Sequence, residues 1–172
     1  MMQNSKSYSN RVAVFALSIM TAPLLLAEQV NASQDVAVRN KQIVTEAFDA
    51  WAAGGQTFFT DVLSPDVNWK IEGSGPSADL HQGREVFLER AVRPFASRMS
   101  KPVSPVSKKV WAEDDHVIIN WEGVGVAGDG LPYSNSYAWI FRMQDGKAVE
   151  VTAFLDLVPY DDVLRRVPSK SR

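Results

Sequence analysis

The spacing of apolar residues changes along the chain, and this change constrains the fold more than any other feature. Over most of residues 35–99, apolar side chains recur every three or four positions, the period of an amphipathic helix. After Pro105 they alternate with polar residues, the period of a half-buried strand. Helices first and strands second predict an α+β domain, in which N-terminal helices pack on a curved, mainly antiparallel sheet.

Turn and helix-stop residues place the expected elements. Helices are expected from Asp35 to the Gly54-Gly55 pair and over residues 57–63 and 84–99, with Pro94 either kinking the last one or splitting off its final turn. Residues 67–71 alternate and predict a strand. Four further strands are expected over residues 106–112, 116–126, 133–143 and 147–157, and a helical turn over residues 160–167. Asp145-Gly146 is a strong hairpin signal between the last two strands.

The first 32 residues have the order of a secretory signal peptide. Lys6 and Arg11 precede an apolar run over residues 12–27, and small residues follow at the expected cleavage site, Ala32, with Ala27 as the second choice. A membrane anchor is the competing interpretation, but the run contains Pro23 and is shorter than the roughly 20 residues that span a bilayer. We therefore expect an exported protein, periplasmic or secreted, with a domain over residues 33–167 and a disordered tail over residues 168–172.

Composition excludes several classes of function. The chain has no cysteine, which excludes disulfides and zinc-thiolate or iron–sulfur sites, and its net charge of −2 does not suit nucleic-acid binding. Its two histidines lack the paired spacing of a metal site, so no metal and no cofactor are expected. The glycine-rich run at residues 123–128 matches a dinucleotide motif, but a strand follows it where the motif needs a helix.

Two groups of short motifs together resemble one family. The first is Asn68-Trp-Lys-Ile-Glu-Gly-Ser-Gly-Pro76, followed by Gly83-Arg84-Glu85 at a helix start. The second is Tyr133-Ser-Asn-Ser-Tyr-Ala-Trp-Ile-Phe-Arg142, followed by Asp145-Gly-Lys147 and Phe154-Leu-Asp156. Their order and spacing resemble the SnoaL-like branch of the NTF2-like superfamily, which includes steroid isomerases, polyketide cyclases and limonene-epoxide hydrolase. The resemblance spans residues 36–163. It implies a cone-shaped domain, an apolar pocket between helices and concave sheet, and a homodimer through the outer sheet face.

Asp156 is the first candidate for catalysis. The resemblance places an acid on the last strand, where partial burial raises a carboxylate pKa and makes it a usable base. An aspartate that caps the following turn, before Pro159, is the equally weighted alternative. Glu122 is held as a second carboxylate, although the facing of its strand is open.

The strand over residues 133–141 carries the remaining polar candidates. Its odd-numbered residues share one face by the period-two rule, and they suit the pocket side. Asn135 and Tyr137 are candidate hydrogen-bond donors to a substrate carbonyl. His81 is a candidate proton shuttle, although a solvated loop histidine is favoured. The candidate ligand contacts are Trp69, Tyr133, Trp139, Phe154 and His81.

Three functions follow from these residues and the resemblance. The first is general acid/base proton transfer on a small hydrophobic molecule, as in an isomerase, cyclase or dehydratase, with Asp156 as base. The alternative is a non-catalytic module of the same fold that binds such a molecule. Epoxide hydrolysis is the third, and it is disfavoured because Asn120-Trp-Glu-Gly-Val124 lacks the arginine and aspartate that the resemblance would require.

Overall fold

The structure, a computed structural model, describes residues 22–169 and has the α+β architecture that the sequence predicts. Six strands form one sheet in the order β2-β1-β6-β5-β4-β3. The strands are β1 (Leu63–Ile71), β2 (Leu80–Gln82), β3 (Met99–Glu113), β4 (His116–Ala127), β5 (Pro132–Gln144) and β6 (Lys147–Leu155). The helices are α1 (Ala22–Ala52), α2 (Phe58–Val62), α3 (Arg84–Phe87), the π-helix η1 (Leu88–Val92), α4 (Arg93–Ala96) and α5 (Leu157–Arg166).

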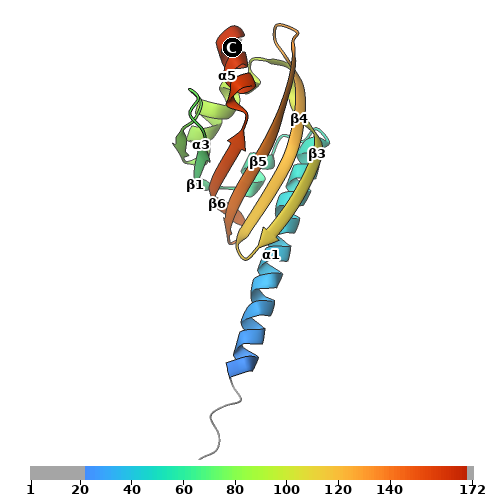
Figure 1. Cartoon of the computed structure of the whole chain (residues 1–172), viewed down its shortest axis with the longest axis vertical. Coiled ribbons are helices and arrows are strands. Elements are labelled where there is room, and N and C mark those ends of the chain that lie inside the picture. Colours follow the sequence, from blue (N-terminus) through green and yellow to red (C-terminus); the bar gives the residue numbers. More distant parts are fainter. Residues whose placement is uncertain (1–21, 170–172) are drawn as a thin grey trace, which may run out of the picture.

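Strands β3 to β6 form an antiparallel meander, as the alternating pattern predicts (Figure 1). Gln144 pairs with Lys147, so Asp145 and Gly146 alone connect β5 to β6. Both connecting residues have positive φ, 51° and 78°, the conformation of a tight hairpin turn that Asp-Gly pairs adopt readily. On the other side of β6, β1 pairs with it in parallel, which local spacing does not reveal.

Helix α1 packs against β3 and β4, and its N-terminal part extends beyond the sheet (Figure 1). The helix begins at Ala22, earlier than the expected start at Asp35, and it continues through Ala32 without a break. Residues 1–21 of the expected signal segment lie outside the described residues, so its cleavage stays a prediction. None of the helices in the described part is both long and apolar enough to cross a membrane.

The third expected helix is divided into three parts. Instead of one helix over residues 84–99, the chain forms α3, the π-helical turn η1 and α4, with Pro94 in the first turn of α4. Proline has no backbone N–H, so the carbonyl of Arg90 loses its usual helical partner, and a π-turn is one way to absorb that loss. Met99, expected in the helix, instead begins β3.

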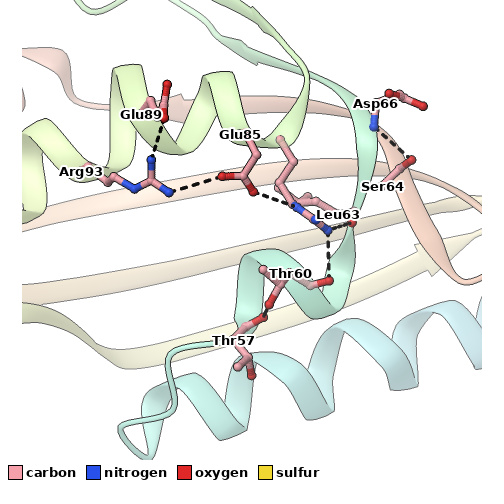
Figure 2. Close-up of polar contacts among 9 residues, drawn as sticks. Thr57, Thr60, Leu63, Ser64, Asp66, Glu85, Glu89 and Arg93 are labelled. Carbon is pink, nitrogen blue, oxygen red and sulfur yellow. Dashed lines mark hydrogen bonds and ion pairs between the residues drawn. The ribbon is translucent and has the colours of Figure 1, made fainter.

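Ion pairs hold the segments of this divided helix together (Figure 2). Arg93 donates to Glu89 at 3.2 Å and to Glu85 at 3.3 Å, so its guanidinium connects α4 to the two preceding segments. Arg84 donates to the carbonyls of Leu63 and Thr60, at 3.2 and 3.5 Å, where α2 ends. These contacts fix the helical segments above the inner face of the sheet, which is the face that the site uses.

Other boundaries differ from the sequence expectation. Strand β3 begins at Met99 and not near residue 106, because an edge strand tolerates prolines such as Pro102 and Pro105 that a central strand would exclude. The last strand ends at Leu155, and α5 begins at once. Helix α5 includes Pro159 in its first turn, where backbone N–H groups have no helical acceptor. Of the expected tail, residues 170–172 lie outside the described part.

Buried apolar side chains form two clusters between the helices and the sheet. The main cluster joins α1, α2 and α3 to the inner face and contains Phe48, Trp69, Trp121, Trp139 and Phe141. The smaller cluster, which we call the α5 cluster, contains Phe95, Met99, Ala127, Tyr133, Tyr160, Val163 and Val167. In β5, the odd-numbered residues from Tyr133 to Phe141 are buried, as the alternation predicts.

His81 is buried, contrary to the expectation of a solvated loop residue. It lies on β2, opposite Trp69 of β1, with its ring centroid 5.9 Å from that of Phe87 and only 4% of its surface exposed. Neither ring nitrogen has a hydrogen-bond partner among the described residues. Burial lowers the pKa of His81 below 6.5; the nearby Asp79 carboxylate opposes this effect, and the Arg90 guanidinium adds to it.

This buried imidazole predicts a pH dependence of stability. Because the folded-state pKa is depressed, the unfolded chain binds the proton more readily, so the free energy of unfolding falls as the pH decreases below 6.5. The slope from this residue is at most about 1.4 kcal/mol per pH unit. Denaturant unfolding between pH 7 and 5 measures it. His81→Leu is expected to flatten this slope. An unchanged slope in the His81 variant contradicts the assignment.

Candidate functional site

A cavity of about 230 Å³ lies between the two apolar clusters. Its walls come from the inner face of the sheet and from α1, α2, α3, η1, α4 and α5. No Asp, Glu, Lys, Arg or His is among its lining residues in the described part of the chain. Those residues are Trp51, Phe59, Trp69, Ile71, Phe87, Ala91, Val92, Phe95, Ala96, Met99, Pro102, Val103, Trp121, Tyr137, Trp139, Ala153, Leu155 and Tyr160.

Stacked aromatic pairs form three parts of the wall. Trp69 of β1 stacks on Phe87 of α3 with ring centroids 4.1 Å apart. Phe95 of α4 stacks on Tyr160 of α5 at 4.4 Å. Each of these two pairs joins different elements, so the rings brace the helices against one another and against the sheet. The third pair, Trp121 and Tyr137, stacks at 3.8 Å across β4 and β5.

The lining residues with the most solvent exposure mark the mouth of the cavity. Ala96 at the end of α4 and Pro102 in β3 are the two exposed ones, and Val92 and Val103 beside them are half-buried, as are Trp51, Phe59 and Leu155 elsewhere in the wall. The mouth therefore lies between α4 and the first part of β3. All four residues at the mouth are apolar, so a charged ligand entering here would lose hydration without gaining a partner.

A chain of hydrogen bonds ends at Tyr137. The amide Nδ2 of Asn135 donates to the Tyr133 hydroxyl at 2.9 Å, and the two tyrosine hydroxyls are 2.9 Å apart. Either tyrosine hydroxyl can be the donor in this pair, and in one of the two arrangements Tyr133 donates to Tyr137. The proton of Tyr137 is then free for an acceptor in the cavity.

The backbone of Asp156 fixes the start of this chain. The Asn135 side chain donates to the carbonyl of Asp156 at 2.8 Å, and the backbone N–H of Asp156 donates back to Oδ1 of Asn135 at 3.0 Å. This reciprocal pair sets which atom of the Asn135 amide faces Tyr133. Burial raises the pKa of both Tyr133 and Tyr137, so both phenols stay protonated at neutral pH.

The ring of Trp121 also lines the cavity. Its indole Nε1 is buried and has no hydrogen-bond partner within the described residues. Tyr160 differs, because its hydroxyl donates to the carbonyl of Ala91 in η1 at 3.0 Å. The Tyr137 hydroxyl can therefore donate to a molecule in the cavity when Tyr133 donates to it, whereas the Tyr160 hydroxyl is already bonded.

Asp156 lies outside the cavity. It is the N-cap of α5, and its carboxylate is exposed and accepts from the backbone N–H of Val158 at 2.9 Å. Of the two alternatives from the sequence, this geometry fits the capping aspartate. The expectation that Asp156 ends the last strand beside the pocket is wrong in position, because β6 stops one residue earlier.

Glu122 and Asp156 lie together on the outer face of the sheet. Both line a hollow of about 340 Å³ beside Ser134 and Ser136 of β5. Glu122 is exposed because Trp121 and Gly123, its neighbours in β4, face inward. Phe154 is 46% exposed on the outer face for the same reason, so the expectation that it contacts a ligand in the pocket is wrong in position.

The remaining candidates lie on the inner face. Trp69, Tyr137 and Trp139 line the cavity, whereas Tyr133 and Asn135 stand behind Tyr137. His81 lies behind Phe87 and does not line the cavity. Across residues 22–169, no three or more His, Cys, Asp or Glu side chains converge in a group that would hold a metal ion.

Sequence reasoning missed several lining residues. Trp121 shares its strand face with the buried residues Val117 and Ile119, so alternation alone was a sufficient signal for it. Tyr160 was assigned only to a terminal helical turn, and nothing in its local sequence indicates that α5 folds back over α4.

Comparisons with known proteins agree with the fold. The chain matches the SnoaL-like domain model over residues 44–151. Among solved structures, it is similar to Bal32a from a soil-derived mobile gene cassette, with 21% identity, a TM-score of 0.63, and coverage of 76% of this chain and 99% of that one. An NTF2-like protein from Burkholderia xenovorans LB400 is 19% identical, with a TM-score of 0.58 and coverage of 74% and 97%. A provisionally assigned SnoaL-like polyketide cyclase from Jannaschia sp. CCS1 is 20% identical, with a TM-score of 0.59 and coverage of 77% and 96%.

Among curated proteins, none matches this sequence significantly. The family model nevertheless covers more than half of the chain, and the similar structures share its helices and six-stranded curved sheet. The chain therefore belongs to the SnoaL-like family of NTF2-like domains.

Proposed function

We propose that this domain binds a small, uncharged and largely apolar molecule that carries a hydrogen-bond acceptor. The observation that carries the proposal is an aromatic cavity whose walls hold no charged side chain in the described residues but do include the Tyr137 hydroxyl, which is paired with the Tyr133 hydroxyl. Apolar burial supplies the affinity, and the Tyr137 hydroxyl orients the acceptor. A charged group would be desolvated there without a counter-ion.

The volume limits the size of the molecule. An engineered cavity of about 150 Å³ holds benzene, so 230 Å³ corresponds to about ten non-hydrogen atoms in the enclosed part. This is one ring with a short substituent, or two fused rings.

Binding is favoured over proton transfer for a chemical reason. A general base must reach the substrate within hydrogen-bond distance, and within residues 22–169 no carboxylate or imidazole lines the cavity. Tyr137 does not replace one, because its raised pKa keeps it protonated. It is a donor only while its proton is present, which suits recognition of a carbonyl or ether oxygen.

Proton transfer remains the second candidate function. The SnoaL-like relative from Jannaschia is provisionally a polyketide cyclase, and the backbone of Asp156 is bonded to the same Asn135 that begins the tyrosine chain. For proton transfer, the Asp156 carboxylate would have to give up its hydrogen bond from the backbone N–H of Val158 and turn toward the cavity to act as the base.

Replacing Tyr137 tests the donor role. Acetophenone and α-methylstyrene have nearly the same shape, but only the ketone accepts a hydrogen bond. Wild type is expected to bind acetophenone more tightly than α-methylstyrene. Tyr137→Phe is expected to weaken the binding of acetophenone by about 3- to 10-fold and to leave the affinity for α-methylstyrene unchanged. Quenching of tryptophan fluorescence reports both affinities, since four tryptophans line the cavity.

Tyr160→Phe is the matched control for this experiment. It removes a hydroxyl that is bonded to the Ala91 carbonyl, so it is expected to lower stability without changing the preference for the ketone. A wild type that binds neither probe contradicts the proposed function. If Tyr137→Phe weakens the binding of both probes equally, the donor role of Tyr137 is contradicted and the binding function is not.

Replacing Asp156 separates the two candidate functions. Asp156→Ala removes the α5 cap and is expected to lower the free energy of unfolding by about 1 kcal/mol. Because the carboxylate lies outside the cavity, the affinity for acetophenone is expected to stay within twofold of wild type. Thermal unfolding and fluorescence titration measure these values. If wild type enolises acetophenone, as monitored by deuterium exchange of its methyl group, and Asp156→Ala loses this activity, Asp156 is instead favoured as the base.

We also propose that the protein is exported and forms a homodimer through the outer face of the sheet. Four large apolar side chains support this dimer: Trp111, Ile118, Val124 and Phe154 are 37–50% exposed on that face. Burying them against a second copy removes apolar surface from water. Light scattering at micromolar concentration is expected to give the dimer mass, and Phe154→Glu the monomer mass. A monomeric wild type contradicts this proposal.

A further inference from the structure

The first half of β3 does not pair regularly with β4. The register shifts between Met99 and Lys101, between Lys101 and Ser104, and between Pro105 and Ser107, whereas residues 107–113 pair one for one. Such bulges bend an edge strand. As a result, Met99, Pro102 and Val103 of this irregular part line the cavity.

Two glycines of β4 make room for this bend. A Cβ atom on Gly123 would lie 2.7 Å from Cγ1 of Val103 and 2.6 Å from the Trp121 ring. A Cβ atom on Gly125 would lie 2.9 Å from Cε of Met99 and 3.0 Å from the Lys101 carbonyl. The irregular part of β3 therefore rests directly on a stretch of β4 that has no side chains on the inner face.

Val103 occupies a particular place in this arrangement. It is half-buried at the mouth of the cavity and packs against both the main cluster and the α5 cluster. Its Cγ1 lies over Gly123, beside the stacked Trp121 and Tyr137 rings. Its methyl groups thus occupy space that would otherwise extend the cavity past the Trp121–Tyr137 pair, toward the solvent.

We propose that Val103, seated on Gly123, is the residue that sets the upper size of the ligand at this site. This inference rests on the proposed binding function and adds a limit on the size of the ligand. A one-ring ketone fits, whereas a fused two-ring ketone contacts the Val103 side chain. The aromatic walls do not set this limit, because their rings are held in stacked pairs, whereas Val103 is on the irregularly paired part of an edge strand.

The test compares acetophenone with acetylnaphthalene, which adds one fused ring to the same ketone. In Val103→Ala, the affinity for acetylnaphthalene relative to acetophenone is expected to rise about tenfold or more, because one to two methyl groups of space are freed. In Val103→Ile, one added methyl group is expected to lower the same ratio. Fluorescence titration of the full chain measures both constants. A ratio that is unchanged in both variants overturns the proposal.

Val106→Ala is the matched control. Val106 is on the same strand, is 59% exposed and does not line the cavity, so its variant is expected to keep the wild-type ratio. An equal rise in this variant also overturns the proposal, since it would show a general loosening of β3. Wild type that binds neither ketone contradicts the binding function itself, so the two failures are distinguishable. Circular dichroism checks that each variant is folded.

Discussion

Stacking of aromatic rings across element boundaries is the interaction on which the rest of the site depends. Trp69 on Phe87 joins the sheet to α3, and Phe95 on Tyr160 joins α4 to α5. Protein interiors normally close to the density of organic crystals, so a cavity persists only where its walls resist collapse. Flat rings held in pairs, each contributing about 0.5–1.5 kcal/mol beyond its buried area, provide that resistance. The divided helix supports them, because η1 carries the carbonyl of Ala91 that accepts from Tyr160.

The same walls determine which chemistry the cavity can carry out. Its lining holds no charged side chain in the described residues, and the tyrosine pair bonded to Asn135 presents the Tyr137 proton to the cavity when Tyr133 donates to Tyr137. The carboxylates lie on the outer face, in a separate hollow that contains Glu122 and Asp156. This separation of donors inside from acids outside supports recognition of a neutral oxygen-bearing guest more directly than it supports proton abstraction.

Much of the fold was predictable because it depends on local periodicity. Alternation placed four strands after Pro105 and assigned the inner face of β5, and the Asp145-Gly146 pair fixed one hairpin. Features that depend on distant contacts were not predictable: the parallel pairing of β1 with β6, the short strand β2 that buries His81, and the bent start of β3. The sequence did not distinguish the two possible roles of Asp156, a helix cap and a buried base. Both roles are compatible with the same local sequence, and they differ in where strand β6 ends.

A crystal soaked with para-bromoacetophenone shows where the ketone binds, because the anomalous signal of bromine locates it. One strong bromine peak is expected inside the aromatic cavity, with the ketone oxygen within hydrogen-bond distance of the Tyr137 hydroxyl. A cavity filled by its own side chains, or a bromine peak confined to the outer hollow beside Glu122 and Asp156, would contradict the proposed binding site.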